Sequence, residues 1–382
     1  MPRLAFPADP NLLENELIEW LTVKKNKRAR DSVRGKQEVN MAVRIIQVGS
    51  GGWGMSWLRL IQESRDCDLV ALVSRGGANM EKAKAAWKIS DERCFTSLER
   101  ALDRDADLVI VTVPHHLHLE IAQSALKAGK NVLIEKPLSD DFSKAKDFAA
   151  FVSQQKRQAW VSQNFRNREQ LWNMKASLSG EGAGAPLYVN IHFRQGDNTR
   201  DIMLWRRESW RAAQWSFLLK ELVIHHFDML RFLLEREAVR VHATGWRFPW
   251  SCSAGPEILS AQIEFEKGLQ VTYVGTADGL GMQTGYEAHW FIQTDKGSMR
   301  WEGKEILLDA GKEDHPRLLS ALDFPGFDRE GVLDEVIKGV QGLPCHVPTV
   351  TDNIRSMAIV EATARSVLER REVWIDELLP AS

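Results

Sequence analysis

Three polar side chains recur at helical spacing in an otherwise apolar stretch between residues 218 and 234. At about 100° per residue, Glu221, His225 and Asp228 fall within about 60° of one another, opposite an apolar stripe that includes His226. A carboxylate beside a histidine orients the ring and stabilises its protonated form, which suits proton transfer. The same pattern fits a solvated polar face, so periodicity alone leaves both interpretations open.

A glycine-rich turn has the spacing of a dinucleotide-binding loop. The strand predicted at Val43 to Val48 runs into a Gly-x-Gly-x-x-Gly sequence that opens a helical stretch from Met55 to Gln62. The first glycine permits the tight turn, the second lets the backbone approach a diphosphate, and the third allows close packing at the helix N-terminus. The alternative is a glycine-rich turn without a ligand. The predicted coenzyme-binding residues here are Gly49, Ser50, Gly51, Gly52, Trp53 and Gly54.

Two residues at the end of the second predicted strand bear on the choice of coenzyme. About twenty positions after the glycine motif, an NAD site has an acid that binds the 2′-hydroxyl of the ribose. This chain has Ser74 and Arg75 there. A hydroxyl and a guanidinium bind a 2′-phosphate, and no carboxylate repels it, so the pattern favours NADP over NAD. In the alternative, Arg75 stacks on the adenine of NAD.

Two further motifs extend this pattern. Residues 111–118 read Val-Thr-Val-Pro-His-His-Leu-His, and residues 128–138 read Ala-Gly-Lys-Asn-Val-Leu-Ile-Glu-Lys-Pro-Leu. With the glycine motif, they resemble the Gfo/Idh/MocA family, the glucose-fructose oxidoreductase and inositol dehydrogenase group, over nearly the whole chain after residue 42. The resemblance implies that Lys136 lies beside the nicotinamide and the substrate hydroxyl, where an ammonium stabilises alkoxide-like charge during hydride transfer. The other coenzyme-binding residues predicted in these motifs are Pro114, His118 and Glu135.

The resemblance also assigns roles on the predicted helix. Family members carry Asp-x-Gly-x-His-x-x-Asp, and this chain has Glu221-x-Val223-x-His225-x-x-Asp228. The resemblance implies a catalytic trio of Lys136, Glu221 and His225, in which His225 is the general acid/base and Glu221 orients it. Two departures bear on this geometry, because Glu is one methylene longer than Asp and Val223 replaces a glycine.

Substrate contacts are implied by the resemblance as well. Asn164 and Arg166, after a strand at Trp160, resemble an Asn-x-Arg pair that the family places near the substrate. Trp210 and Arg211 resemble a pair that approaches the nicotinamide end of the site, and they join the predicted coenzyme contacts. The predicted substrate-binding set is Lys136, Asn164, Arg166, His225 and Asp228.

Hydrophobic patterning divides the chain into three parts. Over residues 41–160, short apolar strands alternate with helical stretches, which predicts an α/β Rossmann domain with a doubly wound parallel sheet. Over residues 161–382, runs with a period of two and terminal helices predict an α+β domain with an open, mostly antiparallel sheet. This domain is expected to serve substrate binding and oligomerisation, and its last helix can pack back on the first domain. Residues 1–40 fit neither part and are interpreted as a mis-assigned start or a loose helical extension without a targeting signal.

Composition excludes several classes of function. The 382 residues are 44% hydrophobic and 27% charged with a net charge of −2, which argues for a folded protein and against a general nucleic-acid or membrane-surface binder. The four cysteines form no Cys-x-x-Cys pair, and the cluster of His115, His116 and His118 lacks further ligands, so no metal site is predicted. The sequence predicts a cytoplasmic protein, and the family resemblance implies a homodimer or homotetramer.

Three functional hypotheses follow from these motifs. The first is an NAD(P)-dependent oxidoreductase that moves a hydride between nicotinamide and a secondary hydroxyl or ketone of a sugar, sugar derivative or cyclitol. The second is a hydrolase of the same family that uses bound NAD transiently to cleave a glycoside. The third is a dinucleotide-sensing regulator without catalysis.

The coenzyme prediction is tested by Arg75→Ala. Loss of the guanidinium is expected to weaken the binding of NADPH much more than that of NADH, because only NADPH carries the 2′-phosphate. Titration of the protein with each reduced nicotinamide measures this, and an equal loss for both contradicts the prediction.

Overall fold

The computed structural model describes residues 42–179, 183–196, 215, 217–251, 253–311, 315–319 and 326–379. The chain from Val43 onward forms one unit that contains two sheets. The prediction of a helical extension over residues 1–40 lies outside the described residues, as do Trp210 and Arg211.

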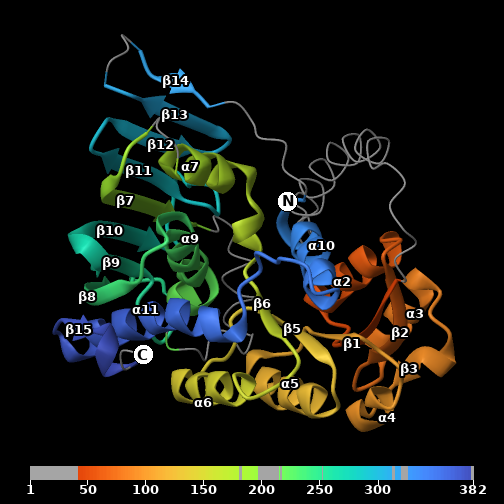
Figure 1. The fold of residues 1–382 in the computed structure, drawn as a ribbon. Coiled ribbons are helices and arrows are strands. Elements are labelled where there is room, and N and C mark those ends of the chain that lie inside the picture. Colours follow the sequence, from red (N-terminus) through yellow and green to blue (C-terminus); the bar gives the residue numbers. More distant parts are fainter. Residues whose placement is uncertain are drawn as a thin grey trace, which may run out of the picture. The chain divides into compact units, whose positions relative to one another are not determined.

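The first sheet has six parallel strands in the order β3-β2-β1-β4-β5-β6 (Figure 1). Its strands are β1 (Val43–Val48), β2 (Cys67–Val73), β3 (Cys94–Phe95), β4 (Leu108–Val111), β5 (Asn131–Glu135) and β6 (Ala159–Ser162). Its helices are α2 (Gly52–Glu63), α3 (Ala78–Trp87), α4 (Leu98–Leu102), α5 (His118–Lys127) and α6 (Phe142–Val152). All four residues of β4 are buried, as the apolar run predicts for a central parallel strand. The predicted doubly wound sheet is confirmed.

The second sheet has nine strands in the order β14-β13-β12-β11-β7-β10-β9-β8-β15. Every neighbouring pair is antiparallel except β7 and β10, which are parallel. The strands are β7 (Pro186–Arg194), β8 (Ala238–Trp246), β9 (Ile258–Phe265), β10 (Leu269–Thr276), β11 (His289–Thr294), β12 (Ser298–Glu302), β13 (Glu305–Asp309), β14 (Arg317–Leu318) and β15 (Val373–Trp374). The predicted open, mostly antiparallel sheet is confirmed.

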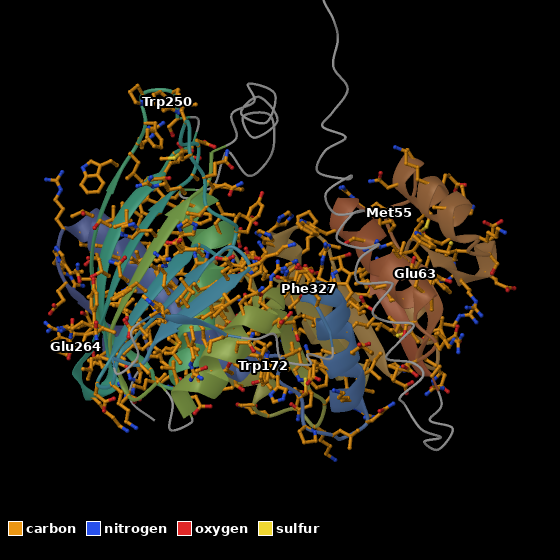
Figure 2. The ribbon with its side chains drawn as sticks, turned by 90° about the horizontal axis from the view of Figure 1, so that it is seen from above. Met55, Glu63, Trp172, Trp250, Glu264 and Phe327 are labelled. Atoms are coloured by element: carbon orange, nitrogen blue, oxygen red, sulfur yellow. The ribbon has the colours of Figure 1, made fainter. Side chains whose placement is uncertain are left out.

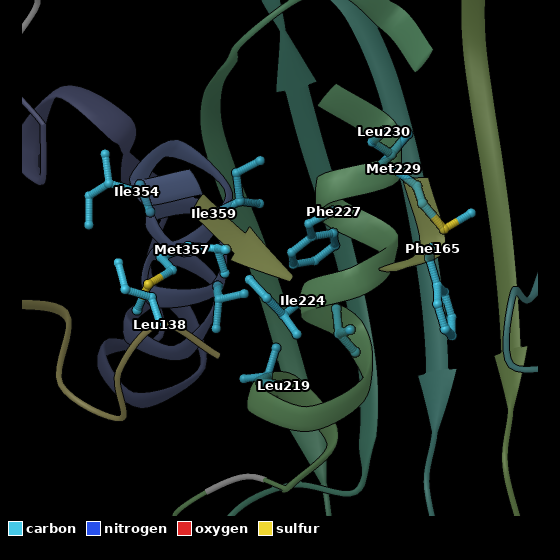
Figure 3. Close-up of a cluster of buried hydrophobic side chains, with 14 of the residues drawn as sticks. Leu138, Phe165, Leu219, Ile224, Phe227, Met229, Leu230, Ile354, Met357 and Ile359 are labelled. Atoms are coloured by element: carbon cyan, nitrogen blue, oxygen red, sulfur yellow. The ribbon is translucent and has the colours of Figure 1, made fainter. Parts of the chain in front are cut away.

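Helices cover one face of the second sheet (Figure 1). These helices are α7 (Glu169–Ser179), α9 (Ile224–Leu234) and α11 (Val350–Glu369). A further helix, α10 (Asp328–Val340), lies beside α2 of the first half. Buried apolar side chains from both halves join in one cluster, so that Leu138 after β5 packs with Ile224 of α9 and Met357 of α11 (Figure 3). This shared core fixes the two sheets relative to each other and sets the geometry of the groups between them.

The predicted helix over residues 218–234 is not regular throughout. Residues Leu218–Val223 form a segment of π-helix, and the α-helix α9 begins only at Ile224. A π-turn is wider than an α-turn, so the angle of 100° per residue does not apply across Glu221 to His225. The relative direction of these two side chains is therefore decided by the structure and not by α-helical periodicity.

No helix in the described ranges combines the length and the apolar character needed to cross a membrane.

Candidate functional site

The glycine motif forms a tight turn between β1 and α2. Gly49 has a φ of +110°, and a Cβ on Gly54 would lie 2.3 Å from the carbonyl oxygen of Gly49. A side chain at Gly54 would force the helix away from the end of β1, and one at Gly49 would collide with Thr112 after β4. These two glycines therefore serve the packing role that the sequence predicts for the first and last glycines of the motif.

The outer side of the same turn is open. A Cβ on Gly51 or Gly52 would meet no atom within 4 Å. Helix α2 begins at Gly52, and its N-cap Gly51 supplies no side-chain cap, whereas Asp141 caps α6 and Thr349 caps α11. The N–H groups of the first turn have no intrahelical partners, and the helix dipole adds partial positive charge there. The turn thus fits the diphosphate of a dinucleotide, which needs N–H donors and close approach to the backbone.

Ser74 and Arg75 lie where the sequence analysis places them, after the end of β2. The hydroxyl of Ser74 is 2.7 Å from that of Ser50 in the glycine motif, so the two predicted coenzyme contacts are joined. Arg75 is exposed and two glycines with positive φ, Gly76 and Gly77, follow it. An exposed guanidinium beside the glycine turn has the freedom to reach a phosphate.

The loops that follow β4 and β5 are joined by His118. Its ring is fully buried, with Nε2 2.8 Å from the Val113 carbonyl oxygen and Nδ1 3.0 Å from the Pro137 carbonyl oxygen. Burial lowers the pKa of His118. His118 thus positions the loop that begins at Pro114 against the Glu-Lys-Pro turn, and its ring is committed to these two carbonyl groups.

Glu135 connects the Glu-Lys-Pro turn to α2. Its Oε1 accepts a hydrogen bond from Trp57 Nε1 at 2.6 Å, and its Oε2 accepts one from the backbone N–H of Lys136 at 3.1 Å. Burial raises the pKa of this carboxyl group. The observed contacts of Glu135 therefore fix the position of the turn that carries Lys136.

Lys136 and Glu221 meet across the two halves of the unit. Lys136 Nζ donates to the backbone oxygen of Glu221 at 2.9 Å and to its carboxylate Oε2 at 3.2 Å. His115 Nε2 is 3.5 Å from the other carboxylate oxygen, Oε1. All three side chains are largely buried, which strengthens these interactions. The sequence analysis expects Glu221 to orient His225, but the carboxylate contacts seen in the structure run to Lys136 and His115.

His225 lies beside these charges in an apolar setting. Its ring stacks on Phe165 with the centroids 4.1 Å apart, and its Nδ1 has no hydrogen-bond partner in the described part of the chain. Burial lowers the pKa of His225 well below 6.5, and the charge of Lys136 lowers it further. A neutral ring with an unused nitrogen is suited to take up a proton.

The alternative of a solvated polar face is wrong. Glu221, His225 and Asp228 are each between 1% and 6% exposed, so all three are buried. His226 is buried on another side, where its Nδ1 is 2.9 Å from the hydroxyl oxygen of Tyr273. The tertiary structure covers this face of the helix, which periodicity cannot reveal.

Two of the predicted substrate contacts pair with each other. Arg166 Nε and Nη2 donate to the two oxygens of Asp228 at 2.7 and 2.8 Å, and Ser356 donates to the same carboxylate at 2.8 Å. Arg166 Nη2 also donates to Asp352 at 2.8 Å. Asn164 donates to Asp328 at 2.6 Å. Substrate binding by these residues stays a prediction, and their observed role is to tie segments together.

Sequence reasoning missed Arg168. Its guanidinium carbon is 4.9 Å from the centroid of Phe165, the ring on which His225 stacks, and its charge contributes to the lowered pKa of His225. Arg168 also pairs with Asp328 and Glu287, at 3.0 and 3.2 Å. These partners come from distant parts of the chain, so no local motif signals the contact.

Comparison with known families supports this geometry. Residues 43–163 match a family model described as "Oxidoreductase family, NAD-binding Rossmann fold", and residues 172–300 match the "GFO/IDH/MocA C-terminal domain". The chain belongs to the GFO/IDH/MocA family of oxidoreductases. The resemblance stated from the motifs is confirmed, and the glycine turn lies within the matched NAD-binding Rossmann domain.

Relatives share the fold at low sequence identity. The chain is 24% identical to an inositol 2-dehydrogenase of Rhizobium meliloti, over 88% of this chain and 100% of the relative. A crystal structure of an Agrobacterium radiobacter oxidoreductase in complex with NAD+, L-tartaric acid and magnesium superposes with a TM-score of 0.78 at 18% identity, over 89% of this chain and 100% of the other. The WlbA dehydrogenase of Bordetella pertussis, in complex with NADH and UDP-GlcNAcA, superposes with a TM-score of 0.74 at 19% identity, with the same coverage.

The buried pair of Arg166 and Asp228 generates a stability prediction. Asp228→Asn leaves the guanidinium without its bidentate carboxylate and is expected to lower the free energy of unfolding by about 3–5 kcal/mol. Urea denaturation measures this loss, with the exposed Asp140→Asn as the matched control. Unchanged stability combined with a raised KM for the substrate would contradict the structural role and favour substrate binding by Asp228.

Proposed function

We propose that this family member is an NAD(P)-dependent dehydrogenase that interconverts a secondary hydroxyl and a ketone on a sugar, a sugar derivative or a cyclitol. The observation that carries the proposal is the buried ammonium of Lys136, which Glu221 holds near the ring of His225. The charge of Lys136 contributes to the lowered pKa of that ring. The names of two relatives support the substrate class. One is the inositol 2-dehydrogenase described above, and the other is a glucose-6-phosphate 3-dehydrogenase of Bacillus subtilis, 22% identical over 50% of this chain.

Lys136 supplies the group that polarises the substrate oxygen. An ammonium has three N–H donors. Two of them are taken, by the backbone oxygen and the carboxylate of Glu221, among the described residues. The third donor is available to the oxygen of the substrate, where it stabilises the negative charge that develops as the C–H bond breaks. Glu221 holds the ammonium in place for this contact.

His225 exchanges the proton. In the direction of oxidation, its neutral ring accepts the proton of the hydroxyl group, and in the direction of reduction the protonated ring returns it. A nicotinamide coenzyme held at the glycine turn would supply the hydride chemistry in either direction. Phe165 holds the ring by stacking, and Lys136 disfavours the protonated ring, so the proton is passed on readily after it is taken up.

The coenzyme preference is a separate part of the proposal. Ser74 and Arg75 after β2 favour NADP, because they offer a hydroxyl and a guanidinium to a 2′-phosphate. We also propose a homodimer or homotetramer, in keeping with the family resemblance.

The activity is tested by a screen of sugars, sugar acids and cyclitols with both nicotinamide coenzymes. The absorbance of the reduced coenzyme measures the reaction. Cleavage of a glycoside without net change in that absorbance would instead support the hydrolase.

The catalytic roles are tested by Lys136→Ala and His225→Ala. Each is expected to lower kcat about a hundredfold or more, because each removes a group that acts on the reacting atoms. Matched controls are the exposed Lys144→Ala and His242→Ala, which are expected to leave kcat unchanged. Full activity of both site variants would exclude this mechanism and favour the regulator.

The pH dependence follows from the lowered pKa of His225. Because its pKa lies well below 6.5, the ring stays neutral at pH 7 and becomes protonated only as the pH falls far below 6.5. Oxidation needs the neutral ring, so kcat/KM for oxidation is expected to hold from pH 7 to below 6.5 and then to decline. An acid limb of kcat/KM centred at or above pH 6.5 would show that His225 is not the base.

A further inference from the structure

A side chain from the far end of the chain contacts the glycine turn. Arg329 lies 273 positions after Ser56 and donates a hydrogen bond from Nη1 to the Ser56 hydroxyl in the first turns of α2. Its guanidinium carbon is 4.5 Å from the centroid of the Trp53 ring, which belongs to the glycine motif. Ser56 in turn donates to the Trp53 carbonyl oxygen at 2.8 Å. These three residues form a small assembly at the N-terminal end of α2, next to the glycine turn.

The start of α10 fixes Arg329 in this place. Asp328 has a φ of +55° and its Oδ1 accepts from the backbone N–H of Arg329 at 2.7 Å. The same carboxylate accepts from Asn164 at 2.6 Å and from Arg168 at 3.0 Å. Figure 1 shows α10 beside α2, and Figure 2 labels Phe327 immediately before this turn. Arg329 is thus held by the packing of the fold.

Two carboxylates lie near the positive charge of Arg329: Asp328, and the buried Glu135, whose pKa this charge lowers against the effect of burial. The side chain of Arg329 is 15% exposed, and its one ion pair within the described ranges is to Asp328, at 3.6 Å. Asp328 also neutralises Arg168, at 3.0 Å. Ser56 and Trp53 are neutral partners. The guanidinium beside the N-terminus of α2 adds to the positive potential of that helix end.

The open backbone of the turn lies at the same helix end. Gly51 and Gly52 leave space outside the turn, and Trp53 is 51% exposed despite its size. We propose that Arg329, supported by Trp53 and Ser56, binds the diphosphate of the dinucleotide and closes the glycine turn from the side of α10. The proposal concerns coenzyme binding and is independent of the substrate class.

The test measures coenzyme binding in the full chain. Arg329→Gln keeps an N–H for Ser56 but removes the charge, and it is expected to raise the Kd for NADH and for ADP-ribose about tenfold, the scale of one charge-assisted hydrogen bond. Adenosine lacks the diphosphate, so its Kd is expected to stay unchanged. Isothermal titration with NADH, ADP-ribose and adenosine gives the three constants.

Arg240→Met is the matched control. Arg240 also lies over an indole, 5.4 Å from the centroid of Trp374, and pairs with Glu264 and Glu372 far along the chain from the glycine motif. It is expected to leave all three constants unchanged. If Arg329→Gln does not fold, Arg329→Lys is measured in its place. It is also expected to raise the Kd for NADH and ADP-ribose, because a lysine cannot reach two phosphate oxygens with two parallel N–H groups as an arginine can. An Arg329 variant that leaves the Kd for ADP-ribose unchanged, or that weakens adenosine equally, overturns the proposal.

Discussion

The contact between Lys136 and Glu221 is the interaction on which the site depends. Lys136 follows β5 of the parallel sheet, and Glu221 lies in the π-helical segment before α9 of the second half. The ammonium is held by both the carboxylate and the backbone oxygen of Glu221, so its position is fixed in two directions. Because both groups are largely buried, removal of either one would leave an uncompensated buried charge and destabilise the fold. The same contact therefore fixes the ammonium for which we propose a catalytic role, and it joins the two halves of the unit.

A second set of buried charges supports this junction from behind. Arg166 precedes α7, Asp228 belongs to α9, and Asp352 belongs to α11, and the three are joined by hydrogen bonds of 2.7 to 2.8 Å. Arg231 extends the set by donating to Asp352 at 2.8 Å. Buried ion pairs contribute little net stability compared with apolar packing, but they admit few alternative arrangements. The set thus orients α9, and with it His225, relative to the parallel sheet.

Local rules of protein structure are broken where ligands are expected. Helix α2 lacks the side-chain cap that α6 and α11 have, and its first turn offers N–H groups to an anion. His225 is buried with an unused Nδ1, within the described residues, in a setting that keeps it neutral. The wide π-turn lets Glu221 point to Lys136 and His115. Departures of this kind are expected at functional sites, where local rules give way to ligand binding.

The sequence by itself determined the classes of structure and the chemistry of single motifs. Alternation of strands and helices, the glycine spacing and the Glu-Lys-Pro signature are local patterns, and a local pattern is enough to predict a Rossmann sheet and a coenzyme turn. Only the tertiary structure decided which charges meet. Glu221 contacts Lys136, Asp228 contacts Arg166, and Arg329 contacts Ser56, each across 62 or more positions. Such pairs depend on how the two sheets pack through their shared core, which no spacing along the chain encodes.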